Sequence, residues 1–311
     1  MANSVLKLPE ESLKRLIEHY RNKEINTKNP HARFAAKLPD TMVTVYSSGK
    51  VMFQGAGAER ETAKWGVADN SKEKTSKAKG DELPPDFATR SVLGSDETGT
   101  GDFFGPITVA ACFVPARQVE LAKELGVKDS KQLTDEYMRK IAPDLKAAFP
   151  HSVLTLSNEK YNQVQAQGWS QGKIKALLHN QALKHVLRKM APEKPEAILI
   201  DQFAERGIYY RHIAQEQDIV RENVLFSTKA ENLHVSVACA SIIARVAFLE
   251  EMDRLSTLAG VILPKGAGAI VDEAAAKILL SRGEGFLKSI TKSHFANTKK
   301  AQTLASKKKR T

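Results

Sequence analysis

Apolar residues recur at helical spacing near the start of the chain and alternate in short runs after it. Between Pro9 and Arg21, the apolar side chains fall on one stripe formed by Leu13, Leu16, Ile17 and Tyr20. This pattern predicts an amphipathic helix. Three runs rich in β-branched or aromatic residues then predict strands, at 31–38, 41–48 and 50–55. Residues 1–67 are therefore interpreted as a small α+β domain with an antiparallel sheet.

A second pattern begins at Ser91, where longer apolar runs alternate with helical segments. The runs that predict strands lie at 91–97, 107–115, 152–157, 196–201 and 223–228. The segments with helical spacing lie at 172–190, 236–254 and 272–281. Strands interleaved with helices indicate an α/β domain built on a mixed sheet, and we assign it to residues 91–295.

Two other segments are strongly polar. Residues 68–90 are rich in charged side chains and contain Pro84-Pro85, which indicates a solvated linker too poor in apolar groups to pack. No acidic residue follows Glu284, and the end of the chain carries the run KKKR. We interpret residues 296–311 as a disordered basic tail that could also hold phosphates without sequence preference.

The formal net charge is +11 at pH 7 and the sequence pI is about 9.5. Basic side chains that neutralise phosphates bind polyanions of any sequence, so the charge favours a nucleic-acid partner over a membrane. The N-terminus lacks the apolar region of a signal peptide, and the most apolar later stretch is interrupted by Arg245. Only Cys112 and Cys239 are present, both inside apolar runs, which predicts reduced, buried thiols in a cytoplasmic protein. Without a sequence signal for an oligomer, a monomer is expected.

Carboxylates stand where apolar segments end. Asp96 and Glu97 end one predicted strand directly before a glycine-rich turn, Asp201 ends another, and Glu231 lies between a β-rich run and an apolar helix. Taken singly, such acids could form an exposed hairpin corner or complement the dipole of a helix start. A buried carboxylate needs a cation or hydrogen bonds, and divalent ions such as Mg²⁺ prefer carboxylate oxygens. The recurrence therefore favours one site that holds two metal ions, the arrangement used for phosphodiester cleavage.

Neighbouring residues receive other interpretations. Lys229, beside Glu231, could reach a phosphate, whereas Glu205 is interpreted as a helix cap. The histidines are scattered, and His179 and His185 fall within a predicted helix, so none is assigned to catalysis. The chain shows no Ser/His/Asp or Cys/His nucleophile pattern that would compete with the acidic site.

Five motifs, read together and in order, resemble a known family. They are GSDETGTGDFFGP, KDSKQL, IDQF, TKAEN and ASIIAR, spread over about residues 91–290. In this order they resemble the type 2 ribonucleases H, and specifically the bacterial ribonucleases HIII. The resemblance implies a ribonuclease H-like mixed sheet flanked by helices, and endonucleolytic hydrolysis of the RNA strand of RNA/DNA hybrids with Mg²⁺ or Mn²⁺, leaving 5′-phosphomonoesters. It implies that the four-carboxylate set of ribonuclease HIII falls on Asp96, Glu97, Asp201 and Glu231.

The same resemblance assigns substrate-binding roles. The N-terminal domain looks like the TATA-box-binding-protein-like domain of ribonucleases HIII, which makes its sheet a nucleic-acid platform with Lys50, Phe53 and Gln54 as candidates. The alternative for these side chains is a purely structural role in the sheet. Backbone N–H groups in the turn Thr98, Gly99, Thr100 and Gly101 could approach the 2′-hydroxyl that distinguishes RNA from DNA. Ser130 and Lys131 could contact a phosphate, or could instead form a capped helix start.

Two alternatives remain open from the sequence. One is incision at single embedded ribonucleotides, as in ribonuclease HII, although that family has an arginine where this chain has Thr100. The other is nucleic-acid binding without catalysis. Acidic side chains at strand ends would repel phosphate and so would not serve a pure binder, which favours catalysis.

Overall fold

The structure, a computed structural model, describes residues 3–27, 29, 31–66, 80–127 and 133–308. The chain divides into two compact units, Met1–Lys77 and Ala78–Thr311, and each is described by itself. In the part of the chain that the structure covers, we find no helix with both the length and the apolar character needed to cross a membrane.

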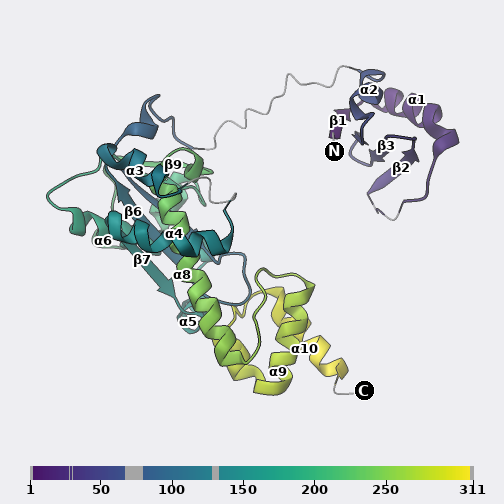
Figure 1. Ribbon diagram of the computed structural model, residues 1–311. Helices are drawn as coiled ribbons and strands as arrows, with labels where there is room; N and C mark the ends of the chain where they lie inside the picture. Colours follow the sequence, from purple (N-terminus) through teal and green to yellow (C-terminus); the bar gives the residue numbers. More distant parts are fainter. Residues whose placement is uncertain (1–2, 28, 30, 67–79, 128–132, 309–311) are drawn as a thin grey trace. The chain divides into compact units, whose positions relative to one another are not determined.

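The first unit is a four-stranded antiparallel sheet with two helices (Figure 1). Strand order is β1-β4-β3-β2, and the core forms where Leu16 of the first helix packs against Val43 and Phe53 of the sheet. The predicted helix and three strands are confirmed. The first strand, NSVLK, and the second helix, AERETA, were not predicted; each is short. The elements are β1 (Asn3–Lys7), α1 (Glu10–Tyr20), β2 (Ala32–Lys37), β3 (Met42–Tyr46), β4 (Lys50–Gln54) and α2 (Ala58–Ala63).

The second unit is built on a five-stranded mixed sheet in the order β7-β6-β5-β8-β9. Strands β5, β6 and β7 pair antiparallel, whereas β5, β8 and β9 pair parallel. All eight residues of β6 are buried, as expected for a strand covered on both faces. The strands are β5 (Val92–Thr98), β6 (Ile107–Val114), β7 (His151–Leu156), β8 (Ala197–Asp201) and β9 (Val224–Ser227).

Helices cover both faces of this sheet. One apolar cluster joins a sheet face to α6 and α7, and a second joins the other face to α8, α3 and α4. A third cluster unites the C-terminal half of α8 with α9 and α10 (Figure 1). The α/β fold with a mixed sheet flanked by helices and preceded by a small α+β domain is thus confirmed. The helices are α3 (Val119–Glu124), α4 (Asp135–Ala148), α5 (Asn158–Ala166), α6 (Gln171–Met190), α7 (Arg206–His212), α8 (Val235–Ala259), α9 (Ala269–Ser289) and α10 (Ala296–Lys308).

Two expectations about polar segments were wrong in part. The expected disordered tail is helix α10 up to Lys308, because Ala301 and Ala305, one helical turn apart, are buried against α9. The second half of the expected linker packs on the second unit: Phe87 is 3% exposed and the N–H of Asp81 donates to the carbonyl of Phe226. The first part of that linker, residues 68–79, lies outside the described residues.

Candidate active site

The sheet topology brings Asp96 and Asp201 to the same edge. Strands β5 and β8 run parallel as neighbours, and Ser95 lies opposite Ile200 in the register. The next residue on each strand is therefore one of the two aspartates, and both lie toward the carboxyl ends of their strands. In open α/β sheets this edge is where binding sites form.

All four predicted carboxylates line one cavity of about 460 Å³. Glu97 follows Asp96 on β5, and Glu231 comes from a short 3₁₀ helix, Ala230–Asn232, placed between β9 and α8. Acids that are up to 135 residues apart in sequence thus share one pocket. The remaining lining residues are Thr98, Leu133, Asp135, Met138, Ser241 and Arg245.

Asp96 is more buried than Asp201 and lies among other negative charges. Burial raises its pKa well above the usual range, and the charges of Glu97 and Asp201 raise it further. Hydrogen bonds from Ser241 and from the N–H of Glu97, at 2.7 Å, act in the opposite direction without cancelling the shift. A divalent cation beside this carboxyl would relieve both causes, so the donor set fits a hard metal ion.

Glu97 is held by two basic side chains of α6. Lys175 Nζ lies 2.7 Å from Glu97 Oε1, and His179 Nε2 lies 2.9 Å from Glu97 Oε2. Burial alone would raise the pKa of Glu97, but the contacts with His179 and Lys175 outweigh it and lower that pKa. His179 is itself fixed through its Nδ1, which lies 2.8 Å from the hydroxyl of Ser95. The carboxylate therefore stays ionised and oriented toward α6.

The sequence reading missed these contacts of Lys175 and His179. Two basic residues four apart share one face of a helix, and in α6 that face is otherwise apolar, with Ile174, Leu178 and Ala182 nearby in sequence. Basic residues on the core-facing side of a helix need acidic or polar partners, so their position in the sequence could have indicated buried contacts. Asp135 was missed too, although it lines the cavity and accepts hydrogen bonds from Arg245 and Lys265.

Asp201 and Glu231 are linked through the backbone. Asp201 Oδ1 accepts the N–H of Ala230 at 2.9 Å, which ties the end of β8 to the 3₁₀ helix that carries Glu231. Burial raises the pKa of Asp201, and the charge of Glu231 contributes in the same direction. Lys229, directly before this helix, adopts a left-handed conformation with φ 57° and is exposed. Its ammonium is thus available to solvent beside the acidic cavity.

The four acids share a cavity but do not form a closed metal cage as they stand. Among the residues that the structure describes, no group of three or more His, Cys, Asp or Glu side chains is gathered closely enough to hold a metal ion. Glu97 turns to Lys175 and His179, and Asp201 to the N–H of Ala230.

The glycine-rich turn follows strand β5 directly. Gly99 has φ +94°, and a Cβ there would lie 2.2 Å from the carbonyl oxygen of Pro106, so only glycine fits. Gly101 is exposed and has open space around it. The carbonyl of Thr100 accepts a hydrogen bond from Gln171 Nε2 at 3.0 Å. The turn is therefore tightly packed at Gly99 and accessible to solvent at Gly101.

The predicted substrate-binding residues of the first unit lie on two opposite faces of its sheet. Lys50 is exposed and Gln54 is half-buried on the face of β4 that the helices leave open, together with Met52. Phe53 is fully buried in the core of this unit, so its assignment to substrate binding was wrong. Strand alternation explains the error, because Phe53 must point opposite to both of its neighbours. The predicted phosphate contacts Ser130 and Lys131 lie outside the described residues.

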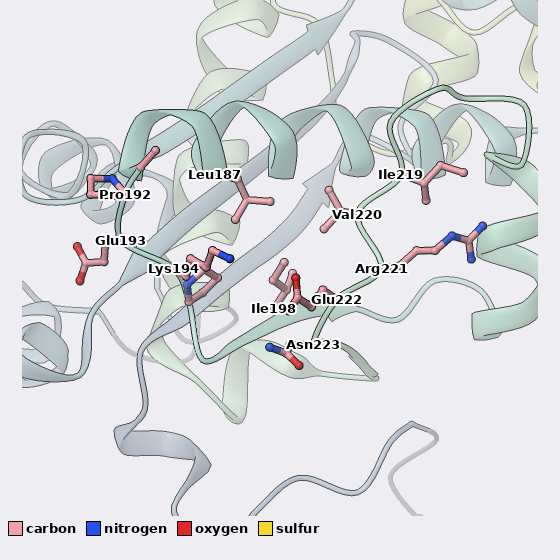
Figure 2. Close-up of a pocket in the computed structure, with 12 residues that line it drawn as sticks. Leu187, Pro192, Glu193, Lys194, Ile198, Ile219, Val220, Arg221, Glu222 and Asn223 are labelled. Atoms are coloured by element: carbon pink, nitrogen blue, oxygen red, sulfur yellow. The ribbon is translucent and has the colours of Figure 1, made fainter.

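A larger cavity, of about 760 Å³, lies at the opposite end of the same strands (Figure 2). Ile198 near the start of β8 and Asn223 just before β9 line it, whereas Asp201 ends β8. Its charged groups carry both signs and do not form an acidic cluster: Figure 2 shows Glu193 and Arg221 on opposite sides, with Lys194 and Glu222 between them. The acidic constellation therefore belongs to the smaller cavity.

The chain matches known proteins over most of its length. The sequence model described as Ribonuclease HII matches residues 93–298, and a domain of unknown function (DUF3378) matches residues 3–78. Ribonuclease HIII of Lysinibacillus sphaericus is 61% identical over 98% of this chain and 100% of its own length. Ribonuclease HIII of Bacillus subtilis is 52% identical over 99% of this chain and 100% of its own length.

Solved structures give the same result. A crystal structure of Bst-RNase HIII in complex with Mn²⁺ has a TM-score of 0.71 and 48% sequence identity, and it covers 98% of this chain and 100% of that one. A Q54A mutant of Bst-RNase HIII matches with a TM-score of 0.70 over 98% of this chain and 99% of that one. The likeness thus extends over both units and both are shared with these relatives.

Proposed function

Since the chain belongs to the ribonuclease HIII family, we propose that it hydrolyses the RNA strand of RNA/DNA hybrids at the cavity lined by Asp96, Glu97, Asp201 and Glu231. The reaction is endonucleolytic and leaves 5′-phosphomonoesters. The observation that carries the proposal is the shared cavity, in which four acids from three separate segments meet. Without bound cations, such a cluster of acids would repel a polyanionic substrate.

These four carboxylates are the residues that would hold Mg²⁺ or Mn²⁺. When bound, two such ions polarise the scissile phosphate, provide a hydroxide nucleophile at neutral pH and stabilise the leaving oxygen. Support for metal binding comes from the buried, like-charged surroundings of Asp96 and from the Mn²⁺ complex of Bst-RNase HIII.

The chain's own residues orient the acids and neutralise charge. Ser241 and the N–H of Glu97 fix Asp96, and Lys175 with His179 fix Glu97. Lys229, exposed beside Glu231, contacts a substrate phosphate. A positive side chain at this position offsets the repulsion between an acidic cavity and the sugar-phosphate backbone.

The turn Thr98–Gly101 reads the sugar. Gly101 is exposed and carries no side chain, so the hybrid backbone can approach its N–H closely. A 2′-hydroxyl can both accept and donate a hydrogen bond there, whereas a deoxyribose cannot. This distinction explains why only the RNA strand is cut.

The open face of the first unit's sheet binds the hybrid. Lys50 and Lys7 are cross-strand partners on exposed positions, next to Gln54 and Met52 on the same face of β4. A basic face with amide and apolar groups can follow a nucleic-acid backbone without reading its sequence. The protein acts as a monomer in the cytoplasm, a compartment that suits the two buried free thiols Cys112 and Cys239.

The test compares Asp96→Asn with Glu205→Gln on an end-labelled hybrid in Mg²⁺, Mn²⁺ or chelator. Glu205 lies four residues after Asp201 but is exposed at the start of α7, which makes it the matched control. Asp96→Asn is expected to lose cleavage by at least about a thousandfold, and Glu205→Gln to keep it. Normal metal-dependent turnover by Asp96→Asn would refute the carboxylate assignment. A duplex with one embedded ribonucleotide, run in parallel, distinguishes ribonuclease HII-like incision, which would cut only that substrate.

A further inference from the structure

Lys292 is a lysine with no exposed surface. It lies directly after α9, on the segment that leads into α10, and is among the largest fully buried side chains in the described residues. Burial lowers the pKa of its ammonium to about 7, although the nearby charge of Asp102 acts in the opposite direction. A lysine is rarely buried completely unless it binds specific partners.

Its partners are carbonyl groups of the segment that follows the glycine-rich turn. Lys292 Nζ donates to the carbonyl of Asp102 at 2.8 Å and to that of Gly105 at 2.5 Å. The backbone adds to this: the N–H of Lys292 donates to the carbonyl of Phe103, and the N–H of Gly105 to that of Ile290. The side chain of Lys292 and the backbone of residues 290–292 therefore both hydrogen-bond to residues 102–105.

These hydrogen bonds also constrain the sugar-reading turn, because residues 102–105 follow it directly in the chain and contact it. The N–H of Asp102 donates to the carbonyl of Gly99, and Gly99 packs against the carbonyl of Pro106 closely enough to exclude any Cβ. Residues 99–106 are thus one closed loop, whose two ends join β5 with its catalytic acids and β6. Fixing Asp102 and Gly105 fixes where Gly101 presents its N–H.

We propose that Lys292 is a positioning residue for RNA recognition: it clamps the loop 99–106 so that the turn meets the 2′-hydroxyl in one geometry. The proposal rests on the proposed function of the turn as the RNA reader. Lys292 is fully buried and its ammonium donates to two backbone carbonyls, so it acts through the backbone of the loop and does not touch the substrate.

The test uses Lys292→Met, which keeps length and apolar volume but removes the donors. The full-length variant is compared with wild type on two hybrids, one with an all-RNA strand and one with a single 2′-deoxynucleotide beside a mapped cleavage site. We expect the preference for the all-RNA site, as a ratio of kcat/KM values, to fall about tenfold, the effect of losing roughly 1.4 kcal/mol of positioning. Hydrogen exchange of the amides in residues 99–105, measured without substrate, is expected to accelerate.

Ile278→Ala is the matched control, since it removes buried apolar surface from the same C-terminal cluster and leaves the loop's hydrogen bonds in place. It is expected to lower stability without changing sugar preference. If Lys292→Met does not fold, Asn158→Ala tests the proposal in its place. Asn158 Nδ2 also donates to the carbonyl of Gly105, at 2.8 Å, so its loss is expected to reduce the preference for the all-RNA site as well.

A folded Lys292→Met with wild-type sugar preference and unchanged exchange in the loop would overturn the proposal. So would an Asn158→Ala variant with wild-type preference, should Lys292→Met fail to fold. These outcomes differ from failure of the proposed function, in which wild type itself would cut neither hybrid, or would cut both without preference for the all-RNA site.

Discussion

The ammonium of Lys175 lies 2.7 Å from Glu97 Oε1, with side-chain exposures of 10% and 12%. A cation from helix α6 is thus paired with one of the acids that line the cavity. Because so little solvent reaches the pair, the attraction between the two charges is only weakly screened. The pair keeps the carboxylate of Glu97 ionised.

Removing this cation should shift the pH dependence of cleavage. In wild type, His179 and Lys175 together lower the pKa of Glu97, so Lys175→Met should raise that pKa. A higher pKa means that Glu97 is protonated at higher pH, and kcat/KM should therefore begin to fall at a higher pH than in wild type. The measurement is a profile from pH 5 to 9 at saturating metal. Lys173→Met is the control, since Lys173 Nζ lies 4.4 Å from the ring centre of Trp169; an acid limb unmoved in Lys175→Met would contradict the prediction.

The length of the side chain at Glu231 should matter less than its charge. Glu231→Gln removes a carboxylate from the cavity and is expected to lower kcat by about a hundredfold or more. Glu231→Asp keeps the charge on a shorter stem, so it should retain a larger share of kcat. Single-turnover cleavage with each variant, at several Mg²⁺ concentrations, tests this order. Equal activity of the two variants would show that the charge of this side chain is not used.

Lys50 and Phe53 should give opposite results, although both were candidates for substrate binding. Lys50→Ala should raise KM for the hybrid by a few-fold with little change in stability, since Lys50 is exposed. Phe53→Ala should destabilise the first unit by about 3–5 kcal/mol, because it empties a buried aromatic site. Trp65 packs against the same core and reports unfolding of this unit. A stable Phe53→Ala variant with raised KM would reverse the assignment.

Deleting residues 1–77 removes the whole first unit at its boundary. We expect KM for the hybrid to rise and kcat to change less, because the acids and the turn all lie in the second unit. Steady-state kinetics at several salt concentrations measure both quantities. An unchanged KM in the shortened protein would exclude a substrate-binding role for the first unit.

His234 should make the second unit acid-sensitive. Burial lowers its pKa from 6.5 to about 4, helped by the charge of Lys123, and its Nδ1 must stay unprotonated to accept the N–H of Ser236 at 3.0 Å. The unfolded chain therefore binds a proton more readily than the folded one, so stability is full above about pH 6.5 and falls by about 3 kcal/mol as pH drops to 4. Urea unfolding followed by Trp169, in a Trp65→Phe background, measures this. A His234→Gln variant should lose that part of the pH dependence; an equal slope in both proteins would contradict it.

Local pattern was sufficient for much of this protein. Helical spacing in 9–21 and 172–190, and the apolar runs that became β5, β6 and β8, depend on the periodicity of a single segment, which is visible in the sequence. Asp96 and Asp201 could likewise be selected from the sequence, because an acid at the end of an apolar strand is unusual wherever the strand goes. Glu231 lies outside the strands, and its selection depended on the resemblance of the motif TKAEN.

The tertiary structure decided what depends on neighbours from elsewhere in the chain. Burial of α10 through Ala301 and Ala305 requires α9, so a lysine-rich segment looked disordered when read alone. The face on which Phe53 lies depends on which side of the sheet the helices cover. The roles of Lys175 and Lys292 exist only because α6 lies beside the end of β5 and the segment after α9 lies beside residues 102–105. A buried cation is identified by its partners, and those partners come from sequence positions 78 and 190 residues away.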